Sequence, residues 1–233
     1  MEIDLKKIKV IAFDADDTLW VNEPYFREAE HKVARLLSAY ETENKIHQEL
    51  YKIEISNLEH YGYGVKAFIL SMIELAVELS NNNVPAKVIG EIIALGKNML
   101  NKPIELLYGV EEVLVSLKDD YRLIVATKGD LLDQERKLEK SGLLDYFHHV
   151  EVMSDKKESD YLKIVKHLDI QPGELLMIGN SLKSDILPLV AIGASAIHIP
   201  YHTTWLHEQV SESECSKESY KTFKNIQELL TIV

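Results

Sequence analysis

The chain has 233 residues, with 26 lysines and arginines against 38 aspartates and glutamates, so its formal net charge is −12. Hydrophobic residues make up 46% and charged residues 27%, which excludes a disordered, collagen-like or coiled-coil protein. The acidic balance argues against a nucleic-acid partner, because a phosphate backbone is repelled by such a surface. A single cysteine cannot form an internal disulfide, so nothing points to an oxidising compartment.

The sequence also gives no sign of export or of a membrane partner. The first residues, MEIDLKKIKVIAF, contain too short an apolar run for a secretory signal. The longest stretch without a formal charge, residues 186–207, is interrupted by two prolines and a glycine. A membrane helix needs about 20 predominantly apolar residues. We therefore expect a cytoplasmic protein.

Five short, mostly apolar runs rich in β-branched residues predict strands that are buried on both faces. They are residues 10–13, 122–126, 149–153, 175–178 and 196–199. Apolar residues at helical spacing lie between the later runs, in residues 110–117 and 161–168. Strands that alternate with helices predict an α/β fold with a Rossmann-like parallel sheet. We expect the polar residues 208–224 to form a surface loop before a final short helix.

Residues 20–107 interrupt this alternation of strand and helix. Their apolar residues recur only at helical spacing, as in residues 33–40, 65–76 and 88–99. The segment is too long for an ordinary connection between two strands. We therefore expect an inserted all-helical domain at residues 20–107, and an α/β core formed by residues 1–19 and 108–233.

The first predicted strand is followed by a cluster of acidic residues with a threonine, Asp14, Asp16, Asp17 and Thr18. In open α/β sheets, ligands bind at the carboxyl ends of the strands. Carboxylates packed at one such end repel one another, and a divalent cation such as Mg²⁺ would relieve that repulsion. The simpler alternative is a turn in which aspartate caps a helix.

Polar groups also follow the next three predicted strands, at Thr127 and Lys128, at Lys156 and Lys157, and at Asn180 and Asp185. A hydroxyl group and free backbone N–H groups can hold an anionic oxygen, and a lysine can neutralise a phosphate. Taken singly, each group is better interpreted as a helix cap or a surface lysine. Four groups in succession instead predict that these strand ends face one crevice.

With these motifs in this order, the chain resembles the haloacid dehalogenase-like hydrolase superfamily over residues 10–19 and 109–200. The helical insertion after the first motif is similar to the cap domain of its phosphatase members. The resemblance implies that Asp14 is the nucleophile, which takes the phosphoryl group as an aspartyl-phosphate. It implies that Asp16 is the general acid and then the base for water, and that Thr18 helps to hold the loop around them.

The resemblance also implies binding groups and a cofactor. Thr127 and the backbone N–H of Lys128 would bind the phosphoryl oxygens, and Lys156 would hold both the phosphate and the nucleophile. Mg²⁺ is the implied cofactor. Its ligands would be Asp14, the main-chain carbonyl of Asp16, and the fourth motif, with Asn180 and Asp185.

Two positions depart from the family pattern. Many members carry aspartate where this chain has Asn180, so Asp185 is the only acidic group of the fourth motif. The choice of inner-sphere ligand between these two stays open. The motif lysine is Lys156 or Lys157, and we favour Lys156 because Tyr161 then stands where the family places the first large apolar residue of the next helix.

The function that these implications favour is a Mg²⁺-dependent phosphatase acting on a small phosphorylated metabolite. Asp16 argues against a haloacid dehalogenase, in which no alkoxide leaving group needs a proton. Alternatives are a nucleoside-monophosphate phosphatase, whose opening motif is similar to Asp14–Leu19, and a phosphomutase. Asn180 motivates a further alternative, a non-catalytic protein that binds a phosphate ligand. The sequence gives no indication of the oligomeric state.

Overall fold

The computed structural model describes residues 3–211 and 220–232, and the chain divides into two compact units. The first unit comprises Met1–Glu23, Ile104–Lys128 and Gln134–Val233. The second comprises Pro24–Pro103 and Gly129–Asp133. The functional assignment of a catalytic core and a cap, with the expected boundaries, stays a prediction.

A six-stranded sheet forms the centre of the first unit, in the order β3-β2-β1-β4-β5-β6. Its strands are β1 (Val10–Phe13), β2 (Arg122–Lys128), β3 (His149–Met153), β4 (Leu175–Gly179), β5 (Ser195–His198) and β6 (Lys221–Thr222). Every neighbouring pair is parallel, so the predicted α/β class is confirmed. The strand order reverses between β1 and β4, which is where open parallel sheets leave a crevice for a ligand.

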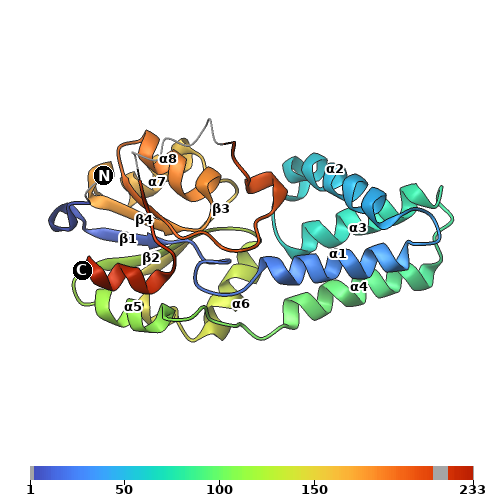
Figure 1. Ribbon diagram of the computed structural model, residues 1–233, viewed down its shortest axis with the longest axis horizontal. Helices are drawn as coiled ribbons and strands as arrows, with labels where there is room; N and C mark the ends of the chain where they lie inside the picture. The colour runs from blue at the N-terminus through green and yellow to red at the C-terminus, as the bar shows by residue number, and fades with distance from the viewer. Residues whose placement is uncertain (1–2, 212–219, 233) are drawn as a thin grey trace. The chain divides into compact units, whose positions relative to one another are not determined.

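Successive side chains of each strand point to opposite sides of the sheet. Because the strands are apolar on both sides, each face packs against its own helices. Ile11 and Phe13 of β1 pack in one apolar cluster, which includes residues of α5 (Val110–Leu117) and of the C-terminal 3₁₀ helix (Ile226–Thr231). Val10 and Ala12 pack in the other, with α7 (Glu158–His167) and α8 (Leu187–Ala191). Figure 1 shows these helices on the two sides of the sheet.

One expectation for the first unit is wrong in part. Residues 208–224 are not simply a surface loop, because β6 lies in this segment and extends the sheet. Glu208 ends a short 3₁₀ helix (Leu206–Glu208), and its side chain is only 13% exposed. Residues 212–219 lie outside the described part of the chain. A two-residue strand has no apolar run, so its sequence carried no signal.

The second unit consists mainly of helices packed around their own core. They are α1 (Glu23–Leu36), α2 (Glu43–Tyr61), α3 (Val65–Leu79) and α4 (Ala86–Asn101). Val33, Met72 and Ile92, one from each predicted stripe, are fully buried together. A Cβ atom on Gly96 would lie 2.5 Å from the side chain of Ile69, so glycine lets α4 approach α3 closely.

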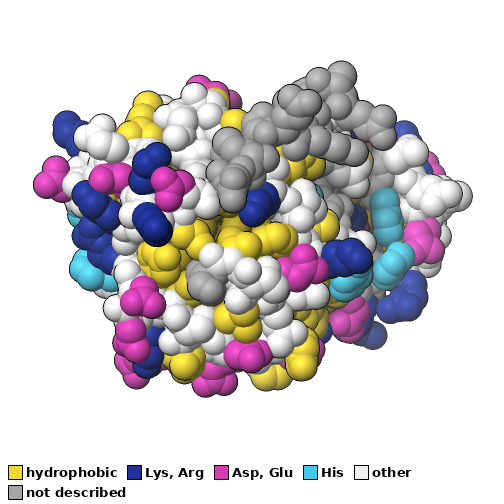
Figure 2. All heavy atoms as spheres, turned by 60° about the vertical axis from the view of Figure 1, so that its left-hand side comes forward, with side chains coloured by type: hydrophobic (Ala, Val, Ile, Leu, Met, Phe, Trp, Pro, Cys, Tyr) yellow, Lys and Arg dark blue, Asp and Glu magenta, His cyan; other side chains and the backbone are white. Residues whose placement is uncertain are grey.

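Two further observations concern the helices and the surface. In the part of the chain that the structure describes, no helix is long and apolar enough to cross a membrane. Figure 2 shows one face of the molecule, on which acidic and basic side chains are interspersed around an apolar area.

Candidate active site

The acidic cluster after β1 sends its three carboxylates in different directions. Asp14 points toward Thr18, whose hydroxyl donates to Asp14 Oδ2 over 3.0 Å. Asp17 adopts a positive φ of 62°, and its carboxylate accepts the backbone N–H groups of Asn22 and Glu23 at the start of α1. The chain therefore relieves the expected repulsion partly by turning Asp17 into a cap for α1, while Asp14 lies at the end of β1, next to β4.

A buried ion cluster joins the ends of three strands. Lys156, which follows β3, donates from Nζ to Asp14 Oδ1 over 2.5 Å and to Asp185 Oδ1 over 2.6 Å. All three side chains are almost fully buried. Lys157 instead lies on the surface, where it pairs with Asp155. Of the two candidate lysines, the geometry thus places Lys156 in the cluster.

The charges of this cluster change the acidity of its members. Burial, together with the negative charge of Asp185, raises the pKa of Asp14 to about 7, although the ammonium of Lys156 opposes this. Burial alone would lower the pKa of Lys156, but the two carboxylates outweigh it and hold the pKa well above its usual value. Two carboxylates around one ammonium leave an excess of buried negative charge.

Asp16 belongs to a second, partly exposed network. Its carboxylate accepts hydrogen bonds from the indole N–H of Trp20 (2.7 Å), from Lys137 Nζ (2.9 Å) and from Gln134 Nε2 (3.0 Å). The same Gln134 nitrogen lies 2.8 Å from the hydroxyl of Thr127. Gln134 and Lys137 stand on α6 (Leu131–Ser141), one helical turn apart, so α6 connects Asp16 to the end of β2.

A third network surrounds the side chain of Lys128. Its ammonium donates to Ser184 Oγ (2.8 Å) and to Glu208 Oε1 (2.6 Å). The other oxygen of Glu208 accepts the hydroxyl groups of Ser181 and Ser184. The side chain of Lys128 therefore makes a nearly buried ion pair with Glu208.

The segment after β4 positions Asp185 through an irregular turn. The segment between β4 and α8 begins with a single π-turn, Leu182–Ile186, and such turns recur at functional sites. Pro188 has no N–H to donate to the carbonyl of Ser184, and the hydroxyl of Tyr161 donates to that carbonyl instead. Asp185 Oδ2 accepts the backbone N–H of Ser181, which fixes its carboxylate toward Lys156.

Gly179 leaves the space that the Asp185 carboxylate occupies. A Cβ atom at this position would lie 2.4 Å from Cγ of Asp185, far inside van der Waals contact. The last residue of β4 is therefore glycine because a buried carboxylate lies directly against its backbone.

Oxygen donors of the kind that Mg²⁺ prefers surround Asp14. Asp14 and Asp185 share one ammonium, and Asn180 Oδ1 lies 3.4 Å from the Thr18 hydroxyl that bonds to Asp14. Burial and, after it, the negative charge of Asp185 disfavour the ionised form of Asp14 and raise its pKa, and a hard cation would offset this by stabilising the carboxylate. The donor set therefore fits a divalent cation with oxygen ligands.

The structure thus gathers Asp14, Thr18, Lys156, Asn180 and Asp185 at the strand ends, while Asp16 and Thr127 are linked through Gln134. Their catalytic, substrate-binding and metal-binding roles stay predictions. Sequence reasoning missed Trp20 as a partner of Asp16, and it missed the α6 and Glu208 side chains. For α6 the only signal was a weak apolar pattern that includes the buried Leu138.

Comparison with known proteins agrees with the observed fold. A family model described as "haloacid dehalogenase-like hydrolase" matches residues 8–193. A crystal structure of a haloacid dehalogenase-like family hydrolase from Xanthomonas campestris superposes with a TM-score of 0.84 at 36% identity, covering 95% of this chain and 88% of that one.

Two curated relatives are phosphatases. The chain is 30% identical to glyceraldehyde 3-phosphate phosphatase of Pyrococcus abyssi, over 83% of this chain and 82% of the relative. It is 25% identical to human N-acylneuraminate-9-phosphatase, over 88% and 84%. The chain therefore belongs to the haloacid dehalogenase-like hydrolase family. The prediction of an enzyme of this family is confirmed, and its phosphatase class agrees with the names of the relatives.

Proposed function

We propose that this hydrolase is a Mg²⁺-dependent phosphatase that removes the phosphoryl group from a small phosphorylated sugar through an aspartyl-phosphate on Asp14. The observation that carries the proposal is the buried cluster of Asp14, Lys156 and Asp185 at the carboxyl ends of the strands, where the strand order reverses between β1 and β4. The Asp14 carboxylate is held by Thr18 and Lys156, so it is oriented before a substrate arrives.

In this proposal, Asp14 attacks phosphorus and the alcohol leaves. A carboxylate that approaches a phosphate meets like charge, and the ammonium of Lys156 reduces that repulsion. The Thr127 hydroxyl and the Lys128 backbone N–H bind the phosphoryl oxygens. Asp14, the Asp16 carbonyl, Asn180 and Asp185 would hold Mg²⁺, which supplies charge neutralisation to the transferring phosphoryl group.

Asp16 transfers the proton in both halves of the proposed reaction. It protonates the leaving oxygen and then takes a proton from the water that hydrolyses the aspartyl-phosphate. In the structure its carboxylate accepts three hydrogen bonds, from Trp20, Lys137 and Gln134. Proton transfer to a leaving group therefore requires Asp16 to exchange at least one of these bonds for the substrate.

The substrate class is the less direct part of the proposal. The two curated relatives are named for an N-acylneuraminate 9-phosphate and for glyceraldehyde 3-phosphate, both small phosphorylated carbohydrates. The excess of acidic residues in this chain disfavours a polyanionic substrate and is compatible with one carrying a single phosphate.

Phosphate release from a panel of sugar phosphates, nucleoside monophosphates and an aryl phosphate tests the proposal, with Mg²⁺ or with EDTA. We expect Mg²⁺-dependent release that is fastest on a sugar phosphate and absent in Asp14→Asn. Fastest release from a nucleoside monophosphate would reassign the substrate class. Isomerisation of a sugar phosphate without release would indicate a phosphomutase, and tight binding without turnover would indicate a non-catalytic protein.

A further inference from the structure

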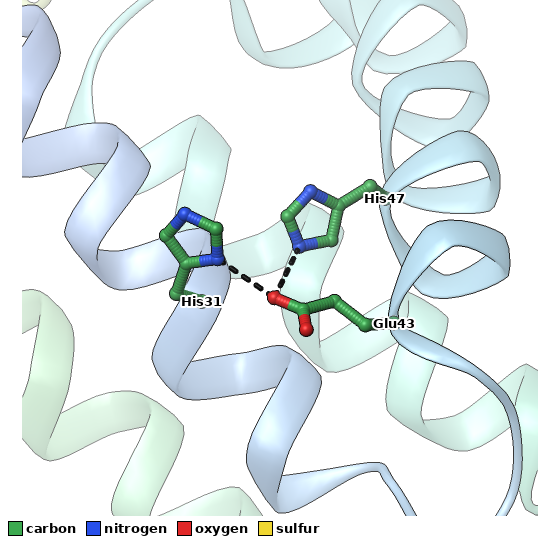
Figure 3. Close-up of side chains that lie close together, drawn as sticks. All are labelled: His31, Glu43 and His47. Carbon is green, nitrogen blue, oxygen red and sulfur yellow. Dashed lines mark hydrogen bonds and ion pairs between the residues drawn. The ribbon is translucent and has the colours of Figure 1, made fainter.

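A second group of metal-binding side chains lies in the helical unit, apart from the candidate active site. His31 stands on α1, and Glu43 and His47 stand one turn apart on α2. Figure 3 shows the two imidazole rings on either side of the Glu43 carboxylate. One potential ligand atom from each of the three residues lies within 4.8 Å of the other two.

The distances in this group suit a small transition-metal ion. His31 Nδ1 lies 2.8 Å from Glu43 Oε1, and His47 Nε2 lies 3.8 Å from the same oxygen. In a tetrahedral zinc site with bonds of about 2.0–2.1 Å, neighbouring ligand atoms are about 3.3 Å apart. The two observed distances lie on either side of that value, so small side-chain rotations would bring all three ligands onto one ion.

His47 supplies an independent observation that points to a missing ligand. Its Nε2 atom is buried and has no hydrogen-bond partner within the described residues. A buried polar atom without a partner typically costs about 1–3 kcal/mol. On the other side of the ring, Nδ1 lies 4.0 Å from a carboxylate oxygen of Glu30, which Arg27 holds in place. This separation is too long for a direct hydrogen bond, but the negative charge of Glu30 favours a proton on Nδ1, which leaves Nε2 free to bind a metal.

We propose that His31, Glu43 and His47 form a Zn²⁺-type site that ties α1 to α2. Two imidazoles and one carboxylate favour Zn²⁺ and related ions over Mg²⁺, which prefers oxygen ligands. His31 and Glu43 are 57% and 58% exposed, so solvent can reach the site and complete the coordination. The site is separate from the proposed Mg²⁺ site, and the inference does not depend on the proposed function.

A comparable group on the first unit is the weaker candidate. His149 Nε2 and His167 Nδ1 lie 3.0 Å and 2.9 Å from Glu151 Oε1, so both nitrogens already have a partner. No orphaned atom points to a ligand there within the described residues. This group could still bind Zn²⁺ in a titration, so we disrupt it by using the His167→Ala protein as the background for all measurements.

Calorimetric titration of the full-length, tag-free protein with Zn²⁺ tests the site, with Mg²⁺ in excess to saturate the active site. In the His167→Ala background we expect one Zn²⁺ per chain. Adding His31→Ala or His47→Ala should weaken binding by about tenfold or more, because a ligand is lost. His60→Ala, on an exposed position of the same helix α2, is the matched control and should leave binding unchanged.

Two further measurements separate the site from a general effect of the metal. Zn²⁺ should raise the melting temperature of the His167→Ala protein and of the His60 control, but not of the His31 or His47 variants. Co²⁺ should give the visible absorption of a four-coordinate site in the same two proteins. Circular dichroism checks that every variant is folded. If a histidine variant does not fold, the Glu43→Gln variant, which also removes a proposed ligand, is measured in its place. Absence of Zn²⁺ binding, or binding that survives both histidine substitutions, would overturn the proposal.

Discussion

Lys156 is held between two buried carboxylates, which makes its charge essential to both. Replacing a partner in such a buried cluster leaves uncompensated charge, at a cost of about 3–5 kcal/mol. We expect Lys156→Met to abolish turnover and to lower the free energy of unfolding by an amount of this order. Lys157→Met is the matched control, because that side chain is 74% exposed. Phosphatase assays and urea unfolding measure the two effects, and equal losses in both variants would remove Lys156 from its proposed role.

Asp16 and Asp17 are neighbours in sequence with different expected roles. Asp16→Asn should slow the reaction by about 10²–10⁴-fold on alkyl phosphates, whose leaving groups need a proton, and less on aryl phosphates. Asp17→Asn should instead weaken the cap of α1 and lower stability, since its carboxylate accepts two backbone N–H groups. Rates on a series of leaving groups distinguish the two. A loss for Asp16→Asn that is the same on every leaving group contradicts an acid role.

Glu208 contributes stability that depends on pH. Burial raises its pKa, but the Lys128 ammonium and the hydroxyl groups of Ser181 and Ser184 outweigh this and lower the pKa to about 2. A folded-state pKa below the ordinary 4.5 means that the contribution is complete above pH 4.5 and is lost as the pH falls toward 2. Glu208→Gln should therefore destabilise the protein by about 1–3 kcal/mol at neutral pH, and by progressively less in acid.

Urea unfolding of Glu208→Gln and of the unmodified protein across this pH range gives the difference at each pH. The exposed Glu135→Gln on α6 is the control for a general effect of removing one negative charge. A difference that stays constant from neutral pH down to pH 2 would show that Glu208 acts through its shape and hydrogen bonds, not through its charge.

The end of strand β4 and the π-turn after it act as one structural element. The Asp185 carboxylate lies against the backbone of Gly179, with no space for a methyl group. Gly179→Ala should push Asp185 away from Lys156, lowering stability by about 1–3 kcal/mol and raising the Mg²⁺ concentration needed for half-activity. At Gly173 a Cβ atom would meet only a carbonyl oxygen at 4.0 Å, so Gly173→Ala is the matched control. Unchanged Mg²⁺ dependence in Gly179→Ala would argue against Asp185 as a ligand.

The same element separates the two candidate ligands of the fourth motif. A carboxylate carries full charge toward a hard cation, whereas an amide offers only a dipole. Asp185→Ala should therefore raise the Mg²⁺ requirement more than Asn180→Ala does, in activity measured against Mg²⁺ concentration. The reverse ranking would make Asn180 the direct ligand and Asp185 a residue that orients it through the surrounding hydrogen bonds.

The sequence could predict an element where a local pattern of apolar residues marks it, and could not predict contacts between elements that are distant in sequence. Runs 10–13 and 149–153 coincide with β1 and β3. Strand β1 is fully buried, as expected in a covered parallel sheet, whereas β3 lies at the edge of the sheet and is mostly half-buried, so the expected burial of both its faces is wrong. The meeting of Asp14 and Lys156 was predictable because the carboxyl ends of parallel strands share one edge. The contacts of Gln134, Lys137 and Glu208 were not, because they depend on how far side chains reach between elements distant in sequence. β6 is too short to carry a pattern.

At the scale of the whole molecule, the chain passes between its two units near residues 23–24, 103–104, 128–129 and 133–134. The short segment Gly129–Asp133 belongs to the helical unit, although it lies between Lys128 and Gln134 of the candidate site. Within that unit, Lys66 Nζ donates to Asp130 Oδ1 over 2.8 Å. The segment that follows Thr127 and Lys128 is therefore tied to the helices that we expect to act as a cap.

We expect this connection to report on movement of the proposed cap. Binding of a phosphate-mimicking metal fluoride with Mg²⁺ should increase hydrogen-exchange protection in residues 129–133 and at the two junctions near residues 23 and 103, since a closing lid excludes water. Lys66→Ala should reduce the change in residues 129–133. The ion pair is half exposed and worth at most about 1 kcal/mol, so the variant stays folded. Lys87→Ala, an exposed position on α4, is the control. Protection that is the same with and without the metal fluoride would mean that the helical unit is a fixed layer, and would leave the chemistry proposed for Asp14 untouched.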